Sequence, residues 1–357
     1  MKLDLPAINY PIYTGTSALK AFATWLSAQS YSQVMVLTDD NTMLHCLPHL
    51  REVFEPEHAI SISPGEPQKN LYGCMAIWTE MTERGFDRKS LMVNLGGGLI
   101  GDIGGFCAAT YKRGIDFVQV PTSLLAQVDA SVGGKTGINF KHYKNHLGAF
   151  RDPAAVFAHP GFFATLPPRE LLSGYAEVLK HCLIADRNRW ESLAELPYLP
   201  EDITPVIADS IAVKARIVAE DPFEKGIRKA LNFGHTIGHG IESVMMDDAA
   251  PIPEVTHGEA VAAGMLAEAF ISREKGLLTE PQLIAIAQRI RSLYPAIAIS
   301  PEAATQIADT ALQDKKNEAG RILCTLLEGI GSFRINVPIT RPEILASLAF
   351  YHAVYTE

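Results

Sequence analysis

A glycine-rich turn between a predicted strand and a predicted helix constrains the fold of this chain more than any other feature. Residues 91–95 form an apolar run with the length of a buried strand, and Gly96, Gly97, Gly98 and Gly101 come directly after it. This spacing satisfies G-x-G-x-x-G, in which backbone N–H groups at a helix N-terminus receive a pyrophosphate. The acidic residue that usually follows ~20 positions later is missing, so this is not the ordinary dinucleotide fingerprint. A tight structural turn would have the same spacing, and the motif alone leaves both interpretations open.

The residues around this turn alternate as they do in a parallel sheet. Apolar runs at residues 34–38, 58–63 and 117–120 predict further strands, and residues 69–84 have a helical pattern. Strand, loop, helix and strand in succession indicate a parallel sheet covered by helices, with ligands at the carboxyl ends of the strands. A nucleotide ribose would then be held by the polar turns after the earlier strands. The candidates are Asp39 and Asn41, or Glu66 and Lys69.

Beyond about residue 160 the pattern becomes helical almost throughout. We therefore expect a Rossmann-like α/β domain over residues 1–160 and an all-α domain over residues 161–357, since 357 residues suffice for two cores. No apolar run reaches the ~18 residues of a membrane span, and the N-terminus lacks a signal-peptide apolar core. The five cysteines are scattered, without a C-x-x-C pair. These features predict a cytoplasmic protein with free thiols, and argue against a cysteine zinc site.

Three histidines in the helical half are candidate metal ligands. His235 and His239 are four residues apart and share one face of a predicted helix, and Gly234 and Gly238 leave that face open to close approach. Two such histidines alone are more often buried and satisfied, because a zinc site needs at least three protein ligands. His257 is a third candidate. Glu177, far upstream, is a fourth, and the metal interpretation needs support from elsewhere in the chain.

The charged residues limit the possible partners. A net charge of −9 argues against nucleic acid, so an anionic substrate would need a local basic cluster. The glycine turn before Lys135 resembles the end of a phosphate-binding loop but lacks its first glycine, which disfavours an NTPase while still suiting an oxyanion. Asp129 lies on an apolar stretch, where a carboxylate is costly unless paired or functional. Glu177 and Lys180, three residues apart with apolar neighbours, predict a partly buried ion pair.

Six stretches of the chain resemble the 3-dehydroquinate synthase family and follow that family's order: residues 96–102, 121–135, 144–145, 173–180, 231–239 and 257–265. Each motif is weak alone, but together they are highly specific, and the resemblance extends from about residue 39 to residue 316. It implies an NAD- and zinc-dependent carbon–oxygen lyase of the shikimate pathway, with Co²⁺ as an alternative metal. Such enzymes convert 3-deoxy-D-arabino-heptulosonate 7-phosphate to 3-dehydroquinate and phosphate. The family also implies a homodimer.

The resemblance implies a role for individual residues. It makes Glu177, His235 and His257 the metal ligands. It places NAD in the first domain, against Asp39, Asn41, Glu66, Lys69, Gly97, Gly98, Asp102, Thr122, Ser123 and Thr165. The catalytic group that it implies is Lys135, Asp129, Asn145, His239 and Lys180. The further substrate contacts are Arg113, Lys144, Lys214, Arg228, Asn232 and Lys316, of which Arg228 would hold the carboxylate by paired hydrogen bonds.

The reaction that the resemblance implies requires the metal, NAD and the substrate to be bound together. A substrate hydroxyl polarised by zinc is oxidised by NAD, phosphate is eliminated, and the hydride returns to the ketone. Ring opening and an intramolecular aldol step then close the carbocycle. A reactive intermediate of this kind must be held away from water. The family pattern is altered at Ser123 and Gly240, in the longer loop between His239 and His257, and in residues 140–143.

Three other functions compete with this one. Another sugar-phosphate cyclase, such as 2-deoxy-scyllo-inosose or 2-epi-valiolone synthase, would act on a substrate without a carboxylate. The presence of Arg228, Asn232 and His239 argues against it. A metal-dependent alcohol or glycerol dehydrogenase would release NADH and would not need the lysine cluster. A non-catalytic relative is disfavoured, because every expected ligand and base is present.

Overall fold

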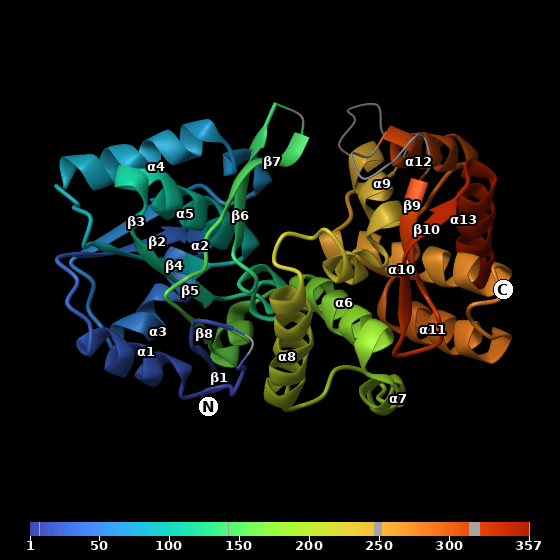
Figure 1. Ribbon diagram of the computed structural model, residues 1–357, viewed down its shortest axis with the longest axis horizontal. Helices are drawn as coiled ribbons and strands as arrows, with labels where there is room; N and C mark the ends of the chain where they lie inside the picture. The colour runs from blue at the N-terminus through green and yellow to red at the C-terminus, as the bar shows by residue number, and fades with distance from the viewer. Residues whose placement is uncertain (7, 142, 246–251, 314–321, 357) are drawn as a thin grey trace. The chain divides into compact units, whose positions relative to one another are not determined.

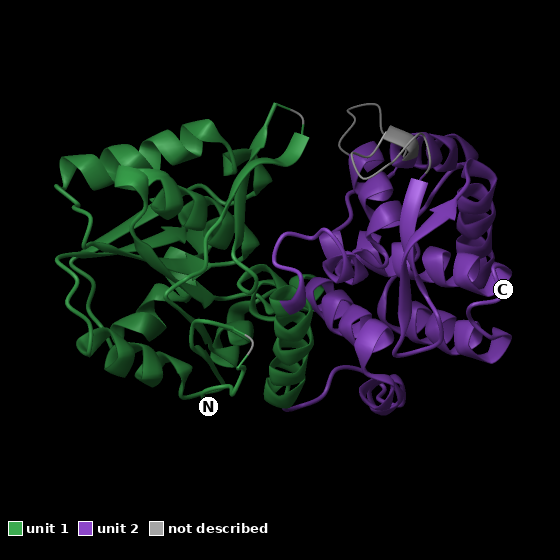
Figure 2. Ribbon diagram, in the orientation of Figure 1, with its two compact units in different colours: residues 1–171, 203–219 green, residues 172–202, 220–357 purple. Residues whose placement is uncertain are grey.

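A computed structural model describes residues 1–357 except 7, 142, 246–251, 314–321 and 357 (Figure 1). The chain forms two compact units, of which the first comprises residues 1–171 and 203–219 and the second residues 172–202 and 220–357 (Figure 2). The expected single boundary near residue 160 therefore differs from the observed division. Helix α8 (Thr204–Glu220) returns to the first unit, where its Lys214 is bonded to Asp129.

The first unit is built on a six-stranded parallel sheet in the order β1-β8-β5-β4-β2-β3. Its strands are β1 (Ile12–Thr14), β2 (Val34–Asp39), β3 (His58–Ile62), β4 (Leu91–Gly96), β5 (Asp116–Pro121) and β8 (Ala155–Ala158). The strands predicted from the apolar runs are confirmed. β4, at the centre, is buried at every position, and its sequence is apolar except for Asn94, as expected in a sheet covered on both faces.

Helices cover both faces of this sheet, because alternate strand residues point to opposite sides. Met35 packs in one core with Ile77 of α4 (Leu71–Glu83) and Ile103 of α5 (Gly98–Thr110). Val36 packs in the other core with Phe22 of α1 (Ala18–Ser27), on the face that α3 (Leu47–Arg51) also covers (Figure 1). The pattern of apolar residues thus sets the two layers that hold the carboxyl ends of the strands in place.

Two details of the first unit differ from expectation. The predicted polar turn at residues 39–41 is the start of α2 (Asp40–His45), because the Asp39 carboxylate accepts the Thr42 N–H and caps a helix there. The helix predicted over residues 69–84 begins at Leu71, after the 3₁₀ turn η1 (Glu66–Gln68). The unit also has an antiparallel hairpin, β6 (Lys135–Phe140) with β7 (Tyr143–Phe150), and short helical turns at η2 (Tyr111–Arg113), η3 (Ala126–Ala130) and η4 (Pro160–Thr165).

The second unit is mostly helical, as predicted. Its helices are α6 (Pro168–Ala185), which begins just before the unit, α7 (Arg187–Ala194), α9 (His235–Met245), α10 (His257–Glu274), α11 (Glu280–Leu293), α12 (Pro301–Gln313) and α13 (Arg341–Thr356), with the turn η5 (Ile227–Asn232). α10 is buried from Gly258 to Ala269, which makes it the central helix of the unit. An antiparallel hairpin of β9 (Ile322–Leu327) and β10 (Phe333–Ile339), which the expected all-α domain did not include, packs against it. Within the described residues, no helix is long and apolar enough to span a membrane.

Candidate metal centre and nucleotide-binding edge

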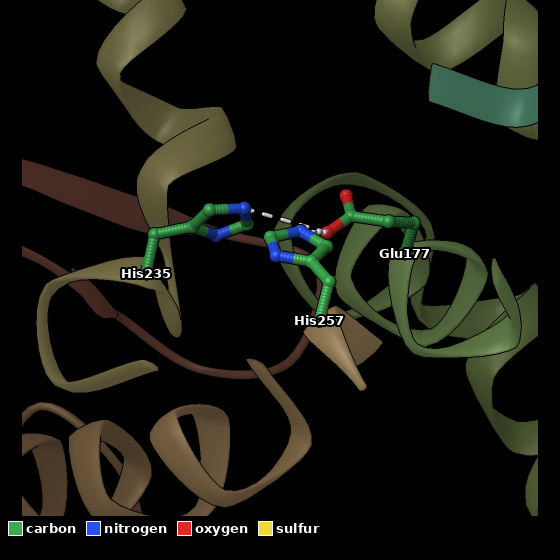
Figure 3. Close-up of side chains that lie close together, drawn as sticks. All are labelled: Glu177, His235 and His257. Atoms are coloured by element: carbon green, nitrogen blue, oxygen red, sulfur yellow. Dashed lines mark ion pairs between the residues drawn. The ribbon is translucent and has the colours of Figure 1, made fainter. Parts of the chain in front are cut away.

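Three side chains from three helices of the second unit converge on one point (Figure 3). Nε2 of His235 lies 3.4 Å from Oε1 of Glu177, and Nε2 of His257 lies 3.7 Å from the same oxygen. Two atoms that each bind a tetrahedral zinc ion at ~2.0–2.1 Å lie about 3.3 Å apart. The donor set and its spacing therefore fit a divalent cation.

Glu177 has the environment of a metal ligand. Its side chain is 0% exposed, and neither carboxylate oxygen has a hydrogen-bond partner among the described residues, although Lys180 forms an ion pair with it. Burial alone would raise the pKa of Glu177, but the Lys180 charge and the two imidazoles hold that pKa well below its usual range. The pair predicted to be partly buried is fully buried. Its carboxylate is therefore ionised, and its oxygens are able to bind a further cation.

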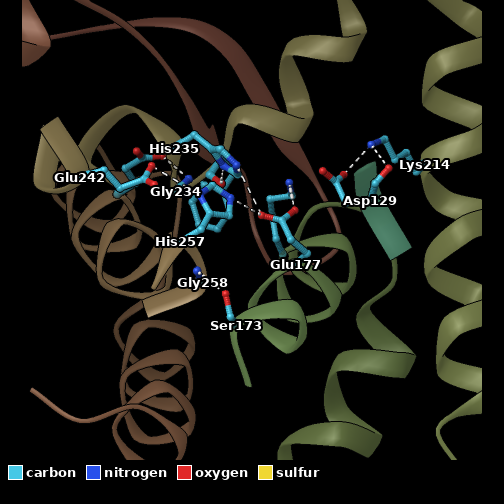
Figure 4. A network of polar contacts seen from close by, with 12 residues as sticks. Asp129, Ser173, Glu177, Lys214, Gly234, His235, Glu242, His257 and Gly258 are labelled. Atoms are coloured by element: carbon cyan, nitrogen blue, oxygen red, sulfur yellow. Dashed lines mark hydrogen bonds and ion pairs between the residues drawn. The ribbon is translucent and has the colours of Figure 1, made fainter. Parts of the chain in front are cut away.

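Both histidines present Nε2 to this carboxylate because their other ring nitrogens are engaged. Nδ1 of His235 lies 3.2 Å from the Phe233 carbonyl oxygen, which can only accept, so this nitrogen carries the proton. Nδ1 of His257 lies 3.4 Å from Oε2 of Glu242 (Figure 4). A metal-ligating histidine usually donates its second N–H to a carbonyl or carboxylate in this way. Glu242 was not identified from the sequence, which has no local signal for this contact.

The electrostatics of the two imidazoles differ. Burial and the nearby Lys180 charge lower the pKa of His235 well below its ordinary value, which leaves the ring neutral. Burial would also lower the pKa of His257, but the nearby carboxylates of Glu177 and Glu242 raise it to about 10. A cation binding to this trio would therefore release a proton from His257.

Glycines let the three ligand-bearing helices approach closely enough for this geometry. A Cβ atom on Gly258 would lie 2.1 Å from the Ser173 carbonyl oxygen, and the Gly258 N–H donates to Oγ of Ser173 at 3.0 Å (Figure 4). A Cβ atom on Gly238 would lie 3.1 Å from the Ala260 carbonyl oxygen. Helix α10 therefore packs closely against both α6 and α9. This agrees with the prediction that the glycines of the histidine helix leave its face open to close approach.

The third histidine of the sequence motif lies beside this cluster. The His239 ring is centred 5.2 Å from that of His235 and 6.4 Å from that of His257. Among the described residues, the groups able to share one ion include His235 and His257 but not His239. His239 is thus placed next to a cation site without belonging to the donor set.

In the first unit, several predicted nucleotide residues lie near the point where the sheet reverses direction. The chain passes from β2 outward to β3 and then to β4 on the other side of β2, so the switch point lies between β2 and β4. Ligands bind outside the carboxyl ends of strands at such a point. Gly97 is the N-cap residue of α5 there and provides no side-chain cap, which leaves first-turn N–H groups for an anion. Asp39 ends β2, and Thr122 and Ser123 follow β5.

A polar network joins several of these groups. Nζ of Lys69, a side chain 6% exposed, donates to Oδ2 of Asp102 and Oδ1 of Asn145, both at 2.6 Å. The Asn139 amide donates to Oε1 of Glu66 at 2.8 Å and accepts the Asn145 N–H at 2.8 Å. Burial raises the pKa of Asp102, against the lowering effect of Lys69. Asn139 thus links Glu66, expected for the cofactor, to Asn145, expected for the substrate, and no sequence motif pointed to Asn139.

The remaining predicted residues divide between the two units. Lys214 donates to the Asp129 carbonyl and to its Oδ1 at 2.7 Å, which supplies the partner that a carboxylate on an apolar stretch needs. Arg113 has a left-handed backbone with φ of 72°, and Thr165 donates to the Phe162 carbonyl. Four more residues are Asn41 in α2, Gly98 at the start of α5, exposed Lys135 in β6 and exposed Lys144 in β7.

In the second unit, the loop after α8 holds two predicted substrate residues. Nη1 of Arg228 donates to the Pro222 carbonyl at 2.5 Å, and the Arg228 N–H donates to Oδ2 of Asp221. The Asn232 amide donates to Oε1 of Glu224 at 2.7 Å. Arg228 is buried, so its direction is set by these contacts. The predicted Lys316 lies outside the described residues.

Family models and curated relatives that match this chain belong to the 3-dehydroquinate synthase family. A model of the 3-dehydroquinate synthase N-terminal region matches residues 59–173, and a model of the C-terminal region matches residues 174–317. The 3-dehydroquinate synthase of Parabacteroides distasonis is 42% identical over 332 residues, covering 92% of this chain and 93% of the relative. That of Alkaliphilus metalliredigens is 38% identical, covering 98% of this chain and 97% of the relative.

Solved structures show the same fold. The 2-epi-5-epi-valiolone synthase of Streptomyces hygroscopicus, solved with NAD⁺ and Zn²⁺ bound, has a TM-score of 0.84 at 27% identity and covers 97% of each chain. A probable glycerol dehydrogenase of Sinorhizobium meliloti has a TM-score of 0.65 at 16% identity, with 97% of each chain covered. The second likeness extends to the fold alone.

Proposed function

The chain belongs to the 3-dehydroquinate synthase family, and from this premise we propose a role for each group of site residues. The protein is a carbon–oxygen lyase that converts 3-deoxy-D-arabino-heptulosonate 7-phosphate to 3-dehydroquinate and phosphate. This step belongs to the shikimate pathway, which leads to chorismate and the aromatic amino acids. The observation that carries the assignment to this chain is the convergence of Glu177, His235 and His257.

Glu177, His235 and His257 would hold Zn²⁺, with Co²⁺ as an alternative. The groups at the carboxyl ends of β2, β3, β4 and β5 would hold NAD. When bound, NAD accepts and returns a hydride, and the cation polarises the substrate hydroxyl that is oxidised. Two features of this chain fit these groups: the uncompleted buried carboxylate of Glu177 and the uncapped start of α5 at Gly97.

The basic side chains would hold the two anionic groups of the substrate. A phosphate and a carboxylate both call for charge-assisted donors, which an acidic chain must supply locally. We assign this binding to Arg113, Lys135, Lys144, Lys214, Arg228, Asn232 and Lys316. Arg228 is assigned to the carboxylate, because its planar guanidinium is buried and held in one direction by the Pro222 carbonyl.

Four residues would orient the reacting atoms or hold protons. Lys180 keeps Glu177 ionised, and His239 lies beside the donor set with a ring able to exchange a proton. Asp129 is fixed by Lys214. Asn145 is fixed by Asn139 and Lys69, so its amide would present a constant direction to the substrate.

The reaction itself tests this assignment. Purified protein with NAD, Zn²⁺ and the heptulosonate phosphate is expected to release phosphate and 3-dehydroquinate in equal amounts, without net NADH. Phosphate release without 3-dehydroquinate would indicate a different cyclase, and net NADH would indicate a dehydrogenase. Absence of both products, with metal and cofactor bound, would contradict the proposal. We also propose that the protein is a cytoplasmic homodimer. Sedimentation of the purified protein tests the oligomeric state, and fractionation of the cells tests the location.

Replacing Asn139 with alanine is expected to weaken NAD binding by roughly tenfold. The change removes a hydrogen bond to Glu66 and one from Asn145, and each hydrogen bond contributes about 0.5–1.5 kcal/mol net. Isothermal titration of NAD into wild type and variant measures the effect, with the unfolding temperature as a check on folding. NAD affinity within twofold of wild type would mean that Asn139 does not position the NAD-binding residues.

A further inference from the structure

Helix α9 begins without a side chain of its own to cap it. The residue before its first position is Gly234, which has a left-handed φ of 81° and no side chain. A Cβ atom there would lie 2.5 Å from Cγ of Met265 and 3.0 Å from the Val261 carbonyl oxygen. Close packing against α10 thus requires glycine at this position and excludes the serine, threonine or aspartate that usually accepts the first N–H groups of a helix.

The missing acceptor comes from the facing helix. Glu268 lies on α10, is 0% exposed, and occupies a stretch that is otherwise mostly alanine and large apolar residues. Its Oε2 accepts the Gly234 N–H at 2.6 Å, and its Oε1 accepts the Ile237 N–H at 3.1 Å. One carboxylate therefore binds the backbone on both sides of His235. A buried carboxylate is costly unless such bonds satisfy it, and the positive end of the α9 dipole favours a negative group there.

The same helix carries a metal ligand at its other end. His257 is the first residue of α10, and the Thr256–Glu259 capping box fixes the start of that helix. Glu268 lies three helical turns later. The distance between the backbones of His235 and His257 is therefore set by two contacts of α10: the glycine packing along α9 and the Glu268 carboxylate at the α9 start. A Cβ atom on Gly264 would lie 2.0 Å from the Gly234 carbonyl oxygen, so the two helix backbones are in direct contact at this point.

We propose that Glu268 is a positioning residue for the metal centre, which sets His235 at its binding distance from His257 by capping α9 from the facing helix. This proposal rests on the metal role proposed above for His235. Glu268 touches neither the cation nor the substrate. Its effect is on the affinity and geometry of the metal site, because a histidine that is displaced by a fraction of an ångström no longer completes a tetrahedral set.

The test compares Glu268→Gln with a matched change on the same helix. Glutamine keeps the size but replaces one acceptor with an NH₂ group that faces a backbone N–H. Ser272, also 0% exposed on α10, donates to the Glu268 backbone carbonyl and accepts the Leu327 N–H of β9, so Ser272→Ala is a control that disturbs the same stretch of α10 but leaves the Glu268 carboxylate in place. The metal-free proteins are titrated with Zn²⁺ against a chromogenic chelator. The Co²⁺-loaded proteins give a visible spectrum that reports ligand geometry.

Glu268→Gln is expected to weaken Zn²⁺ binding by roughly 10- to 100-fold and to alter the Co²⁺ spectrum. Ser272→Ala is expected to lower the unfolding temperature while Zn²⁺ affinity stays within threefold of wild type. Equal Zn²⁺ affinities and Co²⁺ spectra for wild type and Glu268→Gln would overturn the proposal, as would a glutamine variant that fails to fold. A third variant, His235→Ala, tests the metal role of His235 separately from the positioning role of Glu268. If it still binds Zn²⁺ as wild type does, the metal assignment itself is wrong, whatever Glu268 does.

Discussion

Glu177→Gln is expected to lose stoichiometric metal and to lower turnover by roughly 10³-fold or more. A metal ion contributes several kcal/mol to the stabilisation of developing charge, and about 1.4 kcal/mol corresponds to each factor of ten. The amide keeps the size of the side chain but removes the charge that His235 and His257 face across 3.4 and 3.7 Å. It also leaves the Lys180 ammonium buried without its partner, which costs about 3–5 kcal/mol of folding free energy.

Three measurements check this prediction: metal content by elemental analysis, phosphate release at saturating substrate, and the unfolding temperature with and without a chelator. Metal removal should lower the unfolding temperature of wild type, because a ligand that binds only the folded state stabilises it, and should leave Glu177→Gln unchanged. Glu170→Gln, an exposed change on the same helix, is expected to behave as wild type. One equivalent of tightly bound metal in a folded Glu177→Gln protein would exclude Glu177 as a ligand.

Lys69→Met is expected to weaken NAD binding by roughly 10- to 100-fold and to destabilise the first unit by about 1–3 kcal/mol. The first effect is the loss of one charged hydrogen-bond donor, and the second is the cost of leaving the Asp102 carboxylate, which is 23% exposed, without its partner. Lys69 donates to Asp102 and Asn145 at 2.6 Å each, and it lies beside the carboxyl ends of the strands proposed to hold the cofactor. The exposed Lys89→Met in the same unit is the control.

The loss of stability in Lys69→Met should depend on pH in a defined direction. Burial raises the pKa of Asp102 above its ordinary value of 3.8, and without Lys69 that pKa rises further. The folded variant then holds a proton that the unfolded chain releases, so the free energy of unfolding falls as pH rises through this window. Chemical unfolding at pH 5 and pH 8 measures it. A destabilisation that is larger at pH 5 than at pH 8 would contradict this account.

The local features of the fold followed from short-range patterns in the sequence. Largely apolar runs of strand length predicted β2, β3, β4 and β5, because strands of a sheet covered by helices need mostly apolar residues. The glycines after residue 95 predicted the tight turn into α5, and the spacing of His235 and His239 predicted that both lie on one helix. Each of these local features depends on backbone preferences and on the periodicity of apolar residues over a short segment, and both can be read from the sequence.

Only the tertiary structure decided which side chains meet. Four acidic or imidazole groups were candidate ligands, and the packing of α6, α9 and α10 brought Glu177, His235 and His257 together with His239 beside them. The partner of Asp129 proved to be Lys214, 85 positions away, and its helix returned to the first unit across the expected boundary. Contacts between distant segments depend on how whole helices pack, and no local pattern encodes that. The sequence alone determined the elements and the chemistry available on them; the close approach of glycine-lined helices determined where that chemistry is assembled.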